Sequence, residues 1–560
     1  MKKIKGVLLS LGISLSMICS FSSFIYAAGD VELNSTNFPD PIFLTYVTQF
    51  DLDSDGNLSQ TELDNVTQIE LSRKNVSDLK GIEHFSKLVN LYCDNNLLTS
   101  LDLSHNTELK VLVCNANKLS ALDVSNCSKL TLIECSNNNI SALDVSNCLN
   151  ITTIVCFHNN LSKLDVSKNT SLKYLDCGLN KISNIDLTNN TELITCNLGS
   201  NNIDSIDVTK NMKLIELNLR YNSLKDINLT NNAELTKCNL LDNNINSIDV
   251  TKNMKLKELD LSNNNLKDIN LSNNTVLYSF DVSENKLTNL DVSNNIELEK
   301  LLCSNNDIKN LDLSKNSKLE LLVCFDNDIK SLDLSKNSKL NFLMCHYNGL
   351  TSLDLGSNTK LGFASYDRQQ TSCFMIKKLN GKFVVDMKEV VESSGGDLSN
   401  VTMSDGSTLN KDGTITYASL PSTIKYDYNT KCKNPIVTSL MEVIITPKLK
   451  YQVVFEDGDG NTLSDQTIEE GKNALAPKNP TKEGYEFNGW DKDYSSVKDT
   501  IVITPKWKKI TPASNKSSPK TSKIVSSSVS TGDNNQGIEY ISLALLAIVG
   551  ICITRKLKHN

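Results

Sequence analysis

Residues 88–108 read LVNLYCDNNLLTSLDLSHNTE, and the same pattern returns every 21 residues. Thirteen copies follow one another without a change of length. They begin at Leu88, Leu109, Leu130, Ile151, Leu172, Leu193, Leu214, Leu235, Leu256, Leu277, Leu298, Leu319 and Leu340. A fixed period of this size predicts a solenoid, in which each copy forms one coil and stacks on its neighbours.

The first half of each copy has the alternation of a short strand. In the first copy we expect Leu91 and Cys93 to point inward and Tyr92 to point outward. An Asn closes this half in all thirteen copies, from Asn96 to Asn348. A buried Asn must satisfy its amide, and we expect it to bond the backbone of the next coil. This spacing is the leucine-rich repeat signature, and it predicts parallel strands over residues 88–365.

The second half of each copy repeats the LxxLxLxxN spacing, as in residues 98–106. Each copy is therefore two nested half-turns, and we expect strand on both sides of the solenoid. The position of Asn106 holds Asn in every copy except two, which have Cys127 and Cys148.

Residues 1–27 have the form of a secretory signal peptide, with a basic start, an apolar run and small residues at the end. We therefore expect a secreted protein; a membrane anchor is the alternative. The formal net charge of the whole chain is −8. This acidic balance argues against nucleic acid as a partner.

Residues 31–87 are expected to form a small helical cap that covers the start of the solenoid. Asp40 and Pro41 have the composition of a helix start, with Asp as N-cap and Pro in the first turn. A degenerate first repeat of 22 residues follows within this segment.

Residues 51–62 of the cap match the EF-hand calcium-loop pattern in full. Carboxylate and carbonyl oxygens at this spacing surround Ca²⁺. The expected ligands are Asp51, Asp53, Asp55, Asn57 and Glu62. A structural ion that stiffens the cap is one interpretation. The other is a polar turn in which Ser59 and Glu62 only cap a helix.

Most of the cysteines lie at inward strand positions, where a free thiol behaves as a small apolar side chain. Eight share the position of the first, namely Cys93, Cys114, Cys135, Cys156, Cys177, Cys303, Cys324 and Cys345. Cys196 and Cys238 occupy the preceding inward position, and no CxxC metal spacing occurs. So many free thiols in a secreted protein lead to the hypothesis of a host that lives with little oxygen. Cys373 and Cys432 could form a disulfide.

Outward strand positions are apolar in the early and late coils and polar in coils six to ten. Aromatic and long apolar side chains on an exposed sheet are typical of binding surfaces. The predicted partner-binding residues are Tyr92, Val113, Phe157 and Tyr174 in early coils, and Leu321, Phe325, Phe342 and Met344 in late coils. The alternative for the late cluster is that the following module folds over it.

A column of Asp, interrupted twice by Asn, runs along the other side from Asp102 to Asp354, with Ser or Thr beside it in nearly every coil. It is either a solvated ladder or a stripe that binds cations or sugars. After the repeats, residues 371–449 alternate as in strands, and we expect a β-rich module that caps the solenoid. Residues 451–507 predict a second β-rich module with buried aromatic residues.

The tail has two parts. Residues 508–537 are rich in Ser, Lys and Pro and are expected to be an unfolded, wall-spanning linker. Residues 538–560 contain an apolar segment followed by basic residues, which is short for an independent membrane span.

Three resemblances join these parts. The repeats with their leader resemble the internalin-type leucine-rich repeat proteins of Gram-positive surfaces. Residues 451–507 resemble the Listeria–Bacteroides repeat, a β-grasp module, through VxFxDxDG and GYxFxGW. The tail resembles a sortase sorting signal, which implies cleavage between Thr531 and Gly532 and linkage of Thr531 to peptidoglycan. Retention in the membrane is the alternative, because Ser528-Val529 stands where Leu-Pro is usual.

The resemblances imply a non-enzymatic cell-surface protein, held at the wall or the membrane by its tail. Its repeat sheet is expected to bind a host or neighbouring-cell surface protein in adhesion. The alternative is a structural or carbohydrate-binding wall component that uses the Asp/Ser face. The sequence has no Ser/His/Asp, Cys/His or zinc spacing, so no enzyme is predicted.

Overall fold

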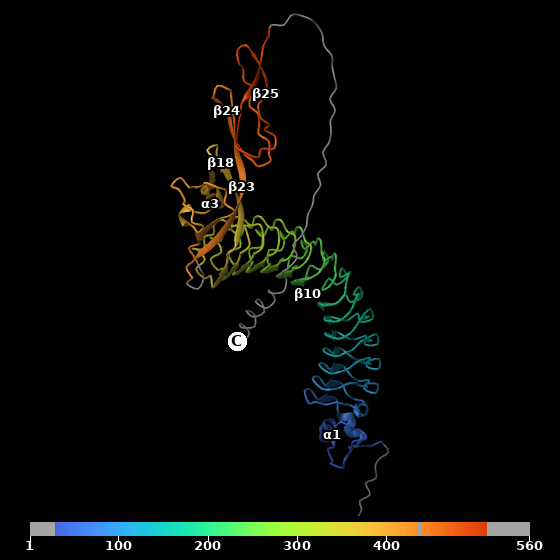
Figure 1. Ribbon diagram of the computed structural model, residues 1–560. Coiled ribbons are helices and arrows are strands. Elements are labelled where there is room, and N and C mark those ends of the chain that lie inside the picture. Colours follow the sequence, from blue (N-terminus) through green and yellow to red (C-terminus); the bar gives the residue numbers. More distant parts are fainter. Residues whose placement is uncertain (1–28, 435–438, 512–560) are drawn as a thin grey trace, which may run out of the picture. The chain divides into compact units, whose positions relative to one another are not determined.

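The computed structural model of the chain describes residues 29–434 and 439–511 (Figure 1). The predicted signal peptide, most of the predicted linker, the sorting segment, and Thr531 and Gly532 lie outside these residues.

The repeats form a parallel sheet of fifteen strands, β3 to β17, in which each strand pairs with the strand of the next coil (Figure 1). Asn90 pairs with Val111, which is the register of a 21-residue coil. The strands are β3 (Gln68–Glu70), β4 (Asn90–Tyr92), β5 (Val111–Val113), β6 (Leu132–Glu134), β7 (Thr153–Val155), β8 (Tyr174–Asp176), β9 (Thr195–Asn197), β10 (Glu216–Asn218), β11 (Lys237–Asn239), β12 (Glu258–Asp260), β13 (Ser279–Asp281), β14 (Lys300–Leu302), β15 (Leu321–Val323), β16 (Phe342–Met344) and β17 (Phe363–Ser365). The predicted leucine-rich repeat solenoid is confirmed.

Each strand buries its middle residue and leaves its two flanking residues at least partly exposed in nearly every coil. Leu91 and the following Cys93 are fully buried, as the alternation predicts. The inward residues of all coils join one continuous apolar core, to which burial of each Leu contributes roughly 1.5–3 kcal/mol.

The Asn that closes each strand holds two coils together. The side-chain amide of Asn243 donates to the carbonyls of Leu240 and Leu241 in its own coil and to that of Leu219 in the preceding coil, at 3.0–3.3 Å. Its Oδ1 accepts the backbone N–H of Leu224, 3.0 Å away and also in the preceding coil. The ladder therefore runs to the preceding coil, and the prediction that it runs to the next one was wrong.

The same ladder is continued past the last repeat by Gln369. Its side chain donates to the carbonyls of Cys345 and Tyr366, at 2.8 and 2.9 Å, and accepts the N–H of Leu350 at 3.1 Å. Gln369 thus does for the thirteenth coil what an Asn does for every earlier one.

The second half of each coil forms turns, so the expectation of strand on both sides was wrong. The carboxylate of Asp249 accepts the backbone N–H of Thr251 at 2.9 Å, and the other coils repeat this bond. That N–H is then unavailable to a strand ladder. A tight turn follows, in which Asn253 N–H donates to Val250 O at 3.0 Å.

The Asn of this second half is only half satisfied. The Asn253 amide donates to Leu229 O and Asn232 O of the preceding coil, at 3.0 and 2.9 Å. Its buried Oδ1 has no protein partner, and the same holds for all eleven Asn of this column. Cys127 and Cys148, which replace Asn twice, aim their thiols at the equivalent carbonyls.

The N-terminal cap has the predicted helices. Asp40 caps the first one, accepting the N–H groups of Ile42 and Phe43, and it also accepts the N–H of Ser77 at 2.7 Å in the first coil. The cap comprises β1 (Val31–Glu32) paired with β2 (Asn57–Leu58), α1 (Pro41–Val47), α2 (Gln60–Asn65) and the 3₁₀ turns η1 (Thr48–Phe50) and η2 (Ile82–His84). The pairing of Gln68 with Asn90 confirms a 22-residue first coil.

After the solenoid, the chain forms a sheet of eight strands organised by β23. β23 pairs with β18, β22, β24 and β26, and it runs without a break through the predicted module boundary near residue 450. The elements are β18 (Gln369–Lys377), β19 (Phe383–Asp386), α3 (Met387–Val391), η3 (Glu392–Ser394), η4 (Leu398–Asn400), β20 (Val401–Met403), β21 (Thr414–Tyr417), β22 (Ile424–Asn429), β23 (Leu440–Glu456), β24 (Thr462–Glu469), β25 (Tyr485–Trp490), β26 (Ile501–Ile503) and β27 (Pro505–Lys509). β25 pairs with β27 in a separate two-stranded sheet.

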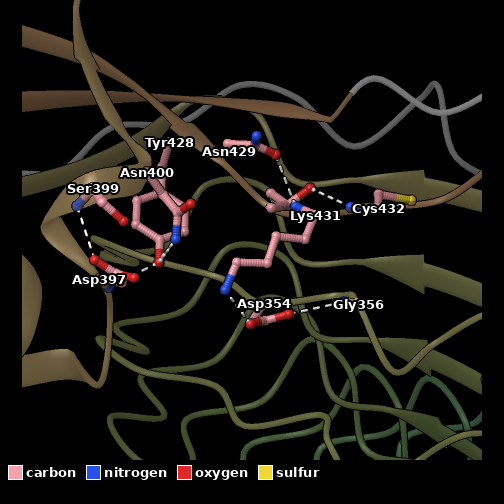
Figure 2. Close-up of polar contacts among 10 residues, drawn as sticks. Asp354, Gly356, Asp397, Ser399, Asn400, Tyr428, Asn429, Lys431 and Cys432 are labelled. Atoms are coloured by element: carbon pink, nitrogen blue, oxygen red, sulfur yellow. Dashed lines mark hydrogen bonds and ion pairs between the residues drawn. The ribbon is translucent and has the colours of Figure 1, made fainter.

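The module of residues 371–449 packs on the last coil and shares its core. Lys431 forms an ion pair with Asp354 at 3.0 Å (Figure 2). The Tyr426 hydroxyl donates to Thr351 O at 2.8 Å. All of these solenoid residues belong to the second half of the coil.

Every cysteine in the described residues is a free thiol. Cys373 and Cys432 are among them, so the disulfide considered from the sequence is absent.

Candidate functional site

The outward face of the sheet presents side chains in columns, because residues 21 apart stand side by side on adjacent strands. Near its C-terminal end these columns become apolar. The late apolar patch consists of Leu302, Leu321, Val323, Phe342, Met344 and Phe363.

Aromatic stacking orders this patch. The rings of Phe342 and Phe363 stack with centroids 4.7 Å apart and planes 16° apart. Beside them Phe325 stacks on His346 at 4.7 Å and 5°. Phe325 is only 6% exposed, so this predicted anchor offers little surface to a partner.

The following module leaves the patch open. Phe363 lies on β17, the strand nearest that module, and still has 45% of its surface exposed. Leu321, Phe342 and Met344 remain partly exposed as well. The alternative in which the module covers the late cluster does not hold for these residues.

The early candidates are not gathered in the same way. Tyr92 and Val113 are neighbours in register, but Glu134 occupies the next place in their column. Tyr174 is 40% exposed on β8, whereas Phe157 is half-buried. The structure therefore places these four residues on one face without joining them into one apolar surface.

Between these regions lies a polar groove of about 470 Å³, lined mainly by outward residues of β8 to β14, with the middle residues of β9 to β12 at its floor. Lys237 sits between Glu216 and Glu258, with Nζ–O distances of 3.9 and 3.4 Å. Glu258 also accepts a hydrogen bond from the Tyr278 hydroxyl. The groove thus contains its own charge network.

Two carboxylates at the late end of the groove were not singled out from the sequence. Asp260 and Asp281 are paired in register on β12 and β13, and Leu302 of the late apolar patch is next. Burial, together with the negative charge of Asp260, raises the pKa of Asp281 to about 7. Carboxylates at one outward position in consecutive repeats were the signal that could have found them.

The loop predicted to hold calcium is preorganised. Carboxylate oxygens of Asp51, Asp53 and Asp55 lie within 4.8 Å of one another. Asp51 accepts the N–H groups of Asp55 and Gly56, and Gly56 adopts the φ of +89° that the sharp turn requires. Asn57 is 2% exposed, and its Oδ1 has no protein partner.

Glu62, the last predicted ligand, also caps helix α2. Its Oε2 accepts the N–H of Ser59 at 2.8 Å, and its Oε1 accepts the N–H of Leu52 at 2.6 Å. The capping box considered from the sequence is therefore present. Its Oε2 also accepts the hydroxyl of Ser59 at 2.8 Å, so capping leaves Oε1 as the oxygen that keeps a lone pair for an ion.

The Asp column on the second half of the coils is exposed to solvent. Hydrogen bonds from the following Thr hold the pKa of Asp249 below its usual value. An open hollow of about 500 Å³ between coils two and four exposes Ser125, Ser146, Asn147 and Lys168.

The cysteine column has no accessible thiol. Burial raises the pKa of Cys93 and Cys114 well above the ordinary range, so thiolate is not available for chemistry. These residues act as packing groups.

No helix in the two described ranges has both the length and the apolar character needed to cross a membrane.

Residues 451–515 match the family model of the Listeria–Bacteroides repeat domain. Among solved structures, the functional domain of InlJ from Listeria monocytogenes, which includes a cysteine ladder, is 29% identical with a TM-score of 0.62. The similarity covers 75% of this chain and 99% of that one. The internalin InlF from Listeria monocytogenes is 23% identical with a TM-score of 0.50, and covers 60% of this chain and 98% of that one. No curated protein sequence matches the chain.

The proteins to which the chain is similar are non-enzymatic binding or surface proteins. The similarity to the InlJ domain indicates a role in protein interaction or adhesion. The in-register repeats, the column of buried cysteines and the C-terminal β module agree with these comparisons, and the chain is an internalin-like leucine-rich repeat protein that carries a Listeria–Bacteroides repeat.

Proposed function

We propose that this chain is a non-enzymatic bacterial surface protein that binds a protein on a host or neighbouring cell through the strand face of its solenoid. The observation that carries this proposal is the late apolar patch, which stays open to solvent at the end of a rigid sheet. Its six apolar residues stand at outward positions in two adjacent columns, and Phe363 is 45% exposed. Contiguous exposed apolar surface of this kind marks an interaction site.

The binding mechanism follows from the geometry of the sheet. The Asn ladders join each coil to its neighbours and keep the outward side chains of the strands in fixed register. Docking of a partner therefore costs little conformational entropy in this face. The stacked pair Phe342 and Phe363 presents a flat aromatic surface, and Met344 adds an adaptable edge.

The test replaces Phe342 and Phe363 by Ser in the full chain and measures binding of the labelled protein to intact cells. We expect at least a tenfold loss, because aromatic anchors at a binding centre contribute about 2 kcal/mol or more each. The matched control is Met254→Ser, which removes an apolar side chain that is 61% exposed and lies off the strand face. Equal binding by the double variant and the control contradicts the proposal.

We further propose that the cap holds one structural Ca²⁺ through Asp51, Asp53, Asp55, Asn57 and Glu62. The three converging carboxylates and the left-handed Gly56 support this, since Ca²⁺ takes six to eight oxygen ligands from such a loop. Bound Ca²⁺ supplies positive charge that offsets carboxylate repulsion and fixes the loop against β1.

Calorimetric titration with CaCl₂ tests the ion site. We expect one ion per chain, and at a hundred times the Kd a stabilisation of about 2.7 kcal/mol of the folded cap. The double variant Asp53→Asn, Asp55→Asn should lose the heat of binding, whereas Asp64→Asn, on α2 outside the loop, should keep it. Equal heats for the two variants would refute the site.

For localisation, we propose that Thr531 is linked to peptidoglycan after cleavage before Gly532. The support is the resemblance of the tail to a sorting signal. In cell fractionation, Thr531→Ala should move the protein from the wall to the membrane fraction, whereas Thr521→Ala in the linker should not. If the unaltered protein is already found in the membrane fraction and Thr531→Ala does not change this, simple retention by the apolar segment is favoured.

A second candidate function is carbohydrate binding or a structural role in the wall through the Asp/Ser face. The open hollow near Ser146 and Asn147 favours it, because hydroxyl and amide groups there face solvent. Glycan-array binding that falls on replacement of both Asp144 and Asp165 by Ala would support this candidate.

A further inference from the structure

The late end of the polar groove combines a carboxylate without a cation and an apolar surface. Asp281 and Leu302 are register neighbours on β13 and β14 and line the same groove. Among the described residues Asp281 takes part in no ion pair, whereas Glu216 and Glu258 share Lys237. Asp281 is thus the carboxylate at this end that is left for an incoming group.

The neighbouring polar groups are already engaged. Asp260 accepts the N–H and the hydroxyl of Ser262 through Oδ1, at 3.1 and 2.5 Å, and the Asn239 amide through Oδ2 at 3.2 Å. Asp281 Oδ1 accepts the N–H of Ser283 at 2.9 Å. What remains is chiefly the second oxygen of Asp281, which suits one N–H donor better than a metal ion that needs several oxygens.

We infer that the protein partner presents an Arg or Lys side chain beside an aromatic or aliphatic one, so that the cation pairs with Asp281 while the apolar group packs on the late apolar patch. This inference rests on the proposed function and specifies the chemistry of its partner. Charge complementarity and the direct contact between groove and patch support it.

Acid should weaken this interaction. The charged groups around Asp281 are Asp260 and Glu258 on β12, Glu284 after β13, and Lys300 on β14. Burial and the charge of Asp260 place the pKa of Asp281 at about 7. Only the ionised form attracts a cation, so the fraction competent for pairing falls about tenfold between pH 8 and pH 6.

The experiment uses a phage-displayed library of random dodecapeptides, selected on the immobilised full chain at pH 8 and 0.15 M NaCl. Parallel selections use Asp281→Asn, Leu302→Ser and the double variant Phe342→Ser, Phe363→Ser. We expect the unaltered chain to enrich peptides with Arg or Lys next to an aromatic or aliphatic residue. The Asp281→Asn selection should lose the basic residue, and the other two should lose the apolar one.

Affinities of the enriched peptides complete the test. We expect about tenfold weaker binding at pH 6 than at pH 8 for the unaltered chain and no such change for Asp281→Asn. Peptides that are apolar only and depend on Phe342 and Phe363 overturn the inference but leave the proposed function standing. If the same peptides are enriched on the unaltered chain and on every variant, or if no peptide is enriched, both the inference and the proposed function are overturned. Binding that requires added CaCl₂ and is lost with Asp281 assigns the groove to a metal ion and also overturns the inference.

Discussion

The two halves of each coil share one spacing, LxxLxLxxN, and yet fold differently. The first half forms a strand whose Asn is satisfied on every side, as at Asn243. The second half forms a turn whose Asn keeps an unpaired buried oxygen, as at Asn253. The apolar positions therefore decide what is buried but not which half becomes a strand. The Asp side chain does not decide it either, since Asp281 on the strand half accepts the N–H of Ser283 as Asp249 on the turn half accepts that of Thr251.

The halves also treat carboxylates in opposite ways. On the strand half, burial raises the pKa of Asp281 to about 7. On the turn half, the backbone N–H of Ser293 lowers the pKa of Asp291. On the strand half, the ionised form of Asp281 is therefore disfavoured at the place where we propose that a partner binds. On the turn half, the fold stabilises the ionised form of Asp291.

The largest expected effect comes from removing the strand-side Asn. Asn243→Ala leaves the buried N–H of Leu224 unpaired and removes one of the two amide bonds to the carbonyl of Leu219, which keeps the one from Asn222. We expect a loss of about 2–4 kcal/mol in the free energy of unfolding. Urea denaturation of the full chain, followed by circular dichroism, measures it. If Asn243→Ala lowers the free energy of unfolding no more than Asn253→Ala does, the two Asn columns contribute equally to stability and the comparison fails.

An intermediate effect on the free energy of unfolding is expected from Asp281→Asn, and this substitution should stabilise the chain. A carboxyl whose pKa is raised on folding binds protons more tightly when folded, so its contribution to stability falls as pH rises from about 4 to about 7. Asn occupies the same outward position at Asn239 and can accept the same N–H. We expect the variant to be more stable by about 1–2 kcal/mol at pH 8, since water in the groove screens the charge, and unchanged at pH 4.

The control for that prediction is Asp291→Asn on the turn half. Because its pKa is lowered in the folded chain, its charge stabilises above pH 4 and the substitution should bring no gain. A stability increase in both variants at pH 8 would show a general effect of net charge.

The smallest effect is expected for Asn253→Cys. The chain already has Cys at this place in two coils, where the Cys148 thiol lies 3.6 Å from Cys127 O. The substitution removes an unpaired oxygen and keeps a weak donor, so we expect a change within about 1 kcal/mol by the same denaturation assay. A loss as large as that of Asn243→Ala would mean that the orphan oxygen has a partner, such as buried water.

The 21-residue period predicted the stacked coils and the inward Leu and Cys, and Asp40 followed by Pro41 predicted the helical start of the cap. The period did not predict the left-handed residue that precedes the closing Asn in every coil, from Asn95 to Tyr347, or the one at Arg368, which precedes Gln369. Leu179 and Tyr221 adopt it as well as Asn does, because the ladder on both sides imposes the turn whatever the side chain.

The candidate site could be predicted only in part, for a related reason. Spacing identified the outward columns, but the degree of exposure depends on neighbours in adjacent coils. His346 shields Phe325, and burial changes the proton affinity of Asp281; neither follows from a single repeat. Exposure and pKa at this site therefore depend on contacts between neighbouring coils, which the sequence of one repeat does not give.

The backward direction of the Asn ladder makes the solenoid unequal at its two ends. Each coil depends on the one that follows it to pair its own carbonyl and N–H groups, and the thirteenth depends on Gln369. Truncation from the C-terminal side should therefore bare the backbone of the last remaining coil and start fraying there. Truncation from the N-terminal side bares a side-chain amide instead, which water can solvate, beside the strand-edge backbone groups that truncation at either end exposes.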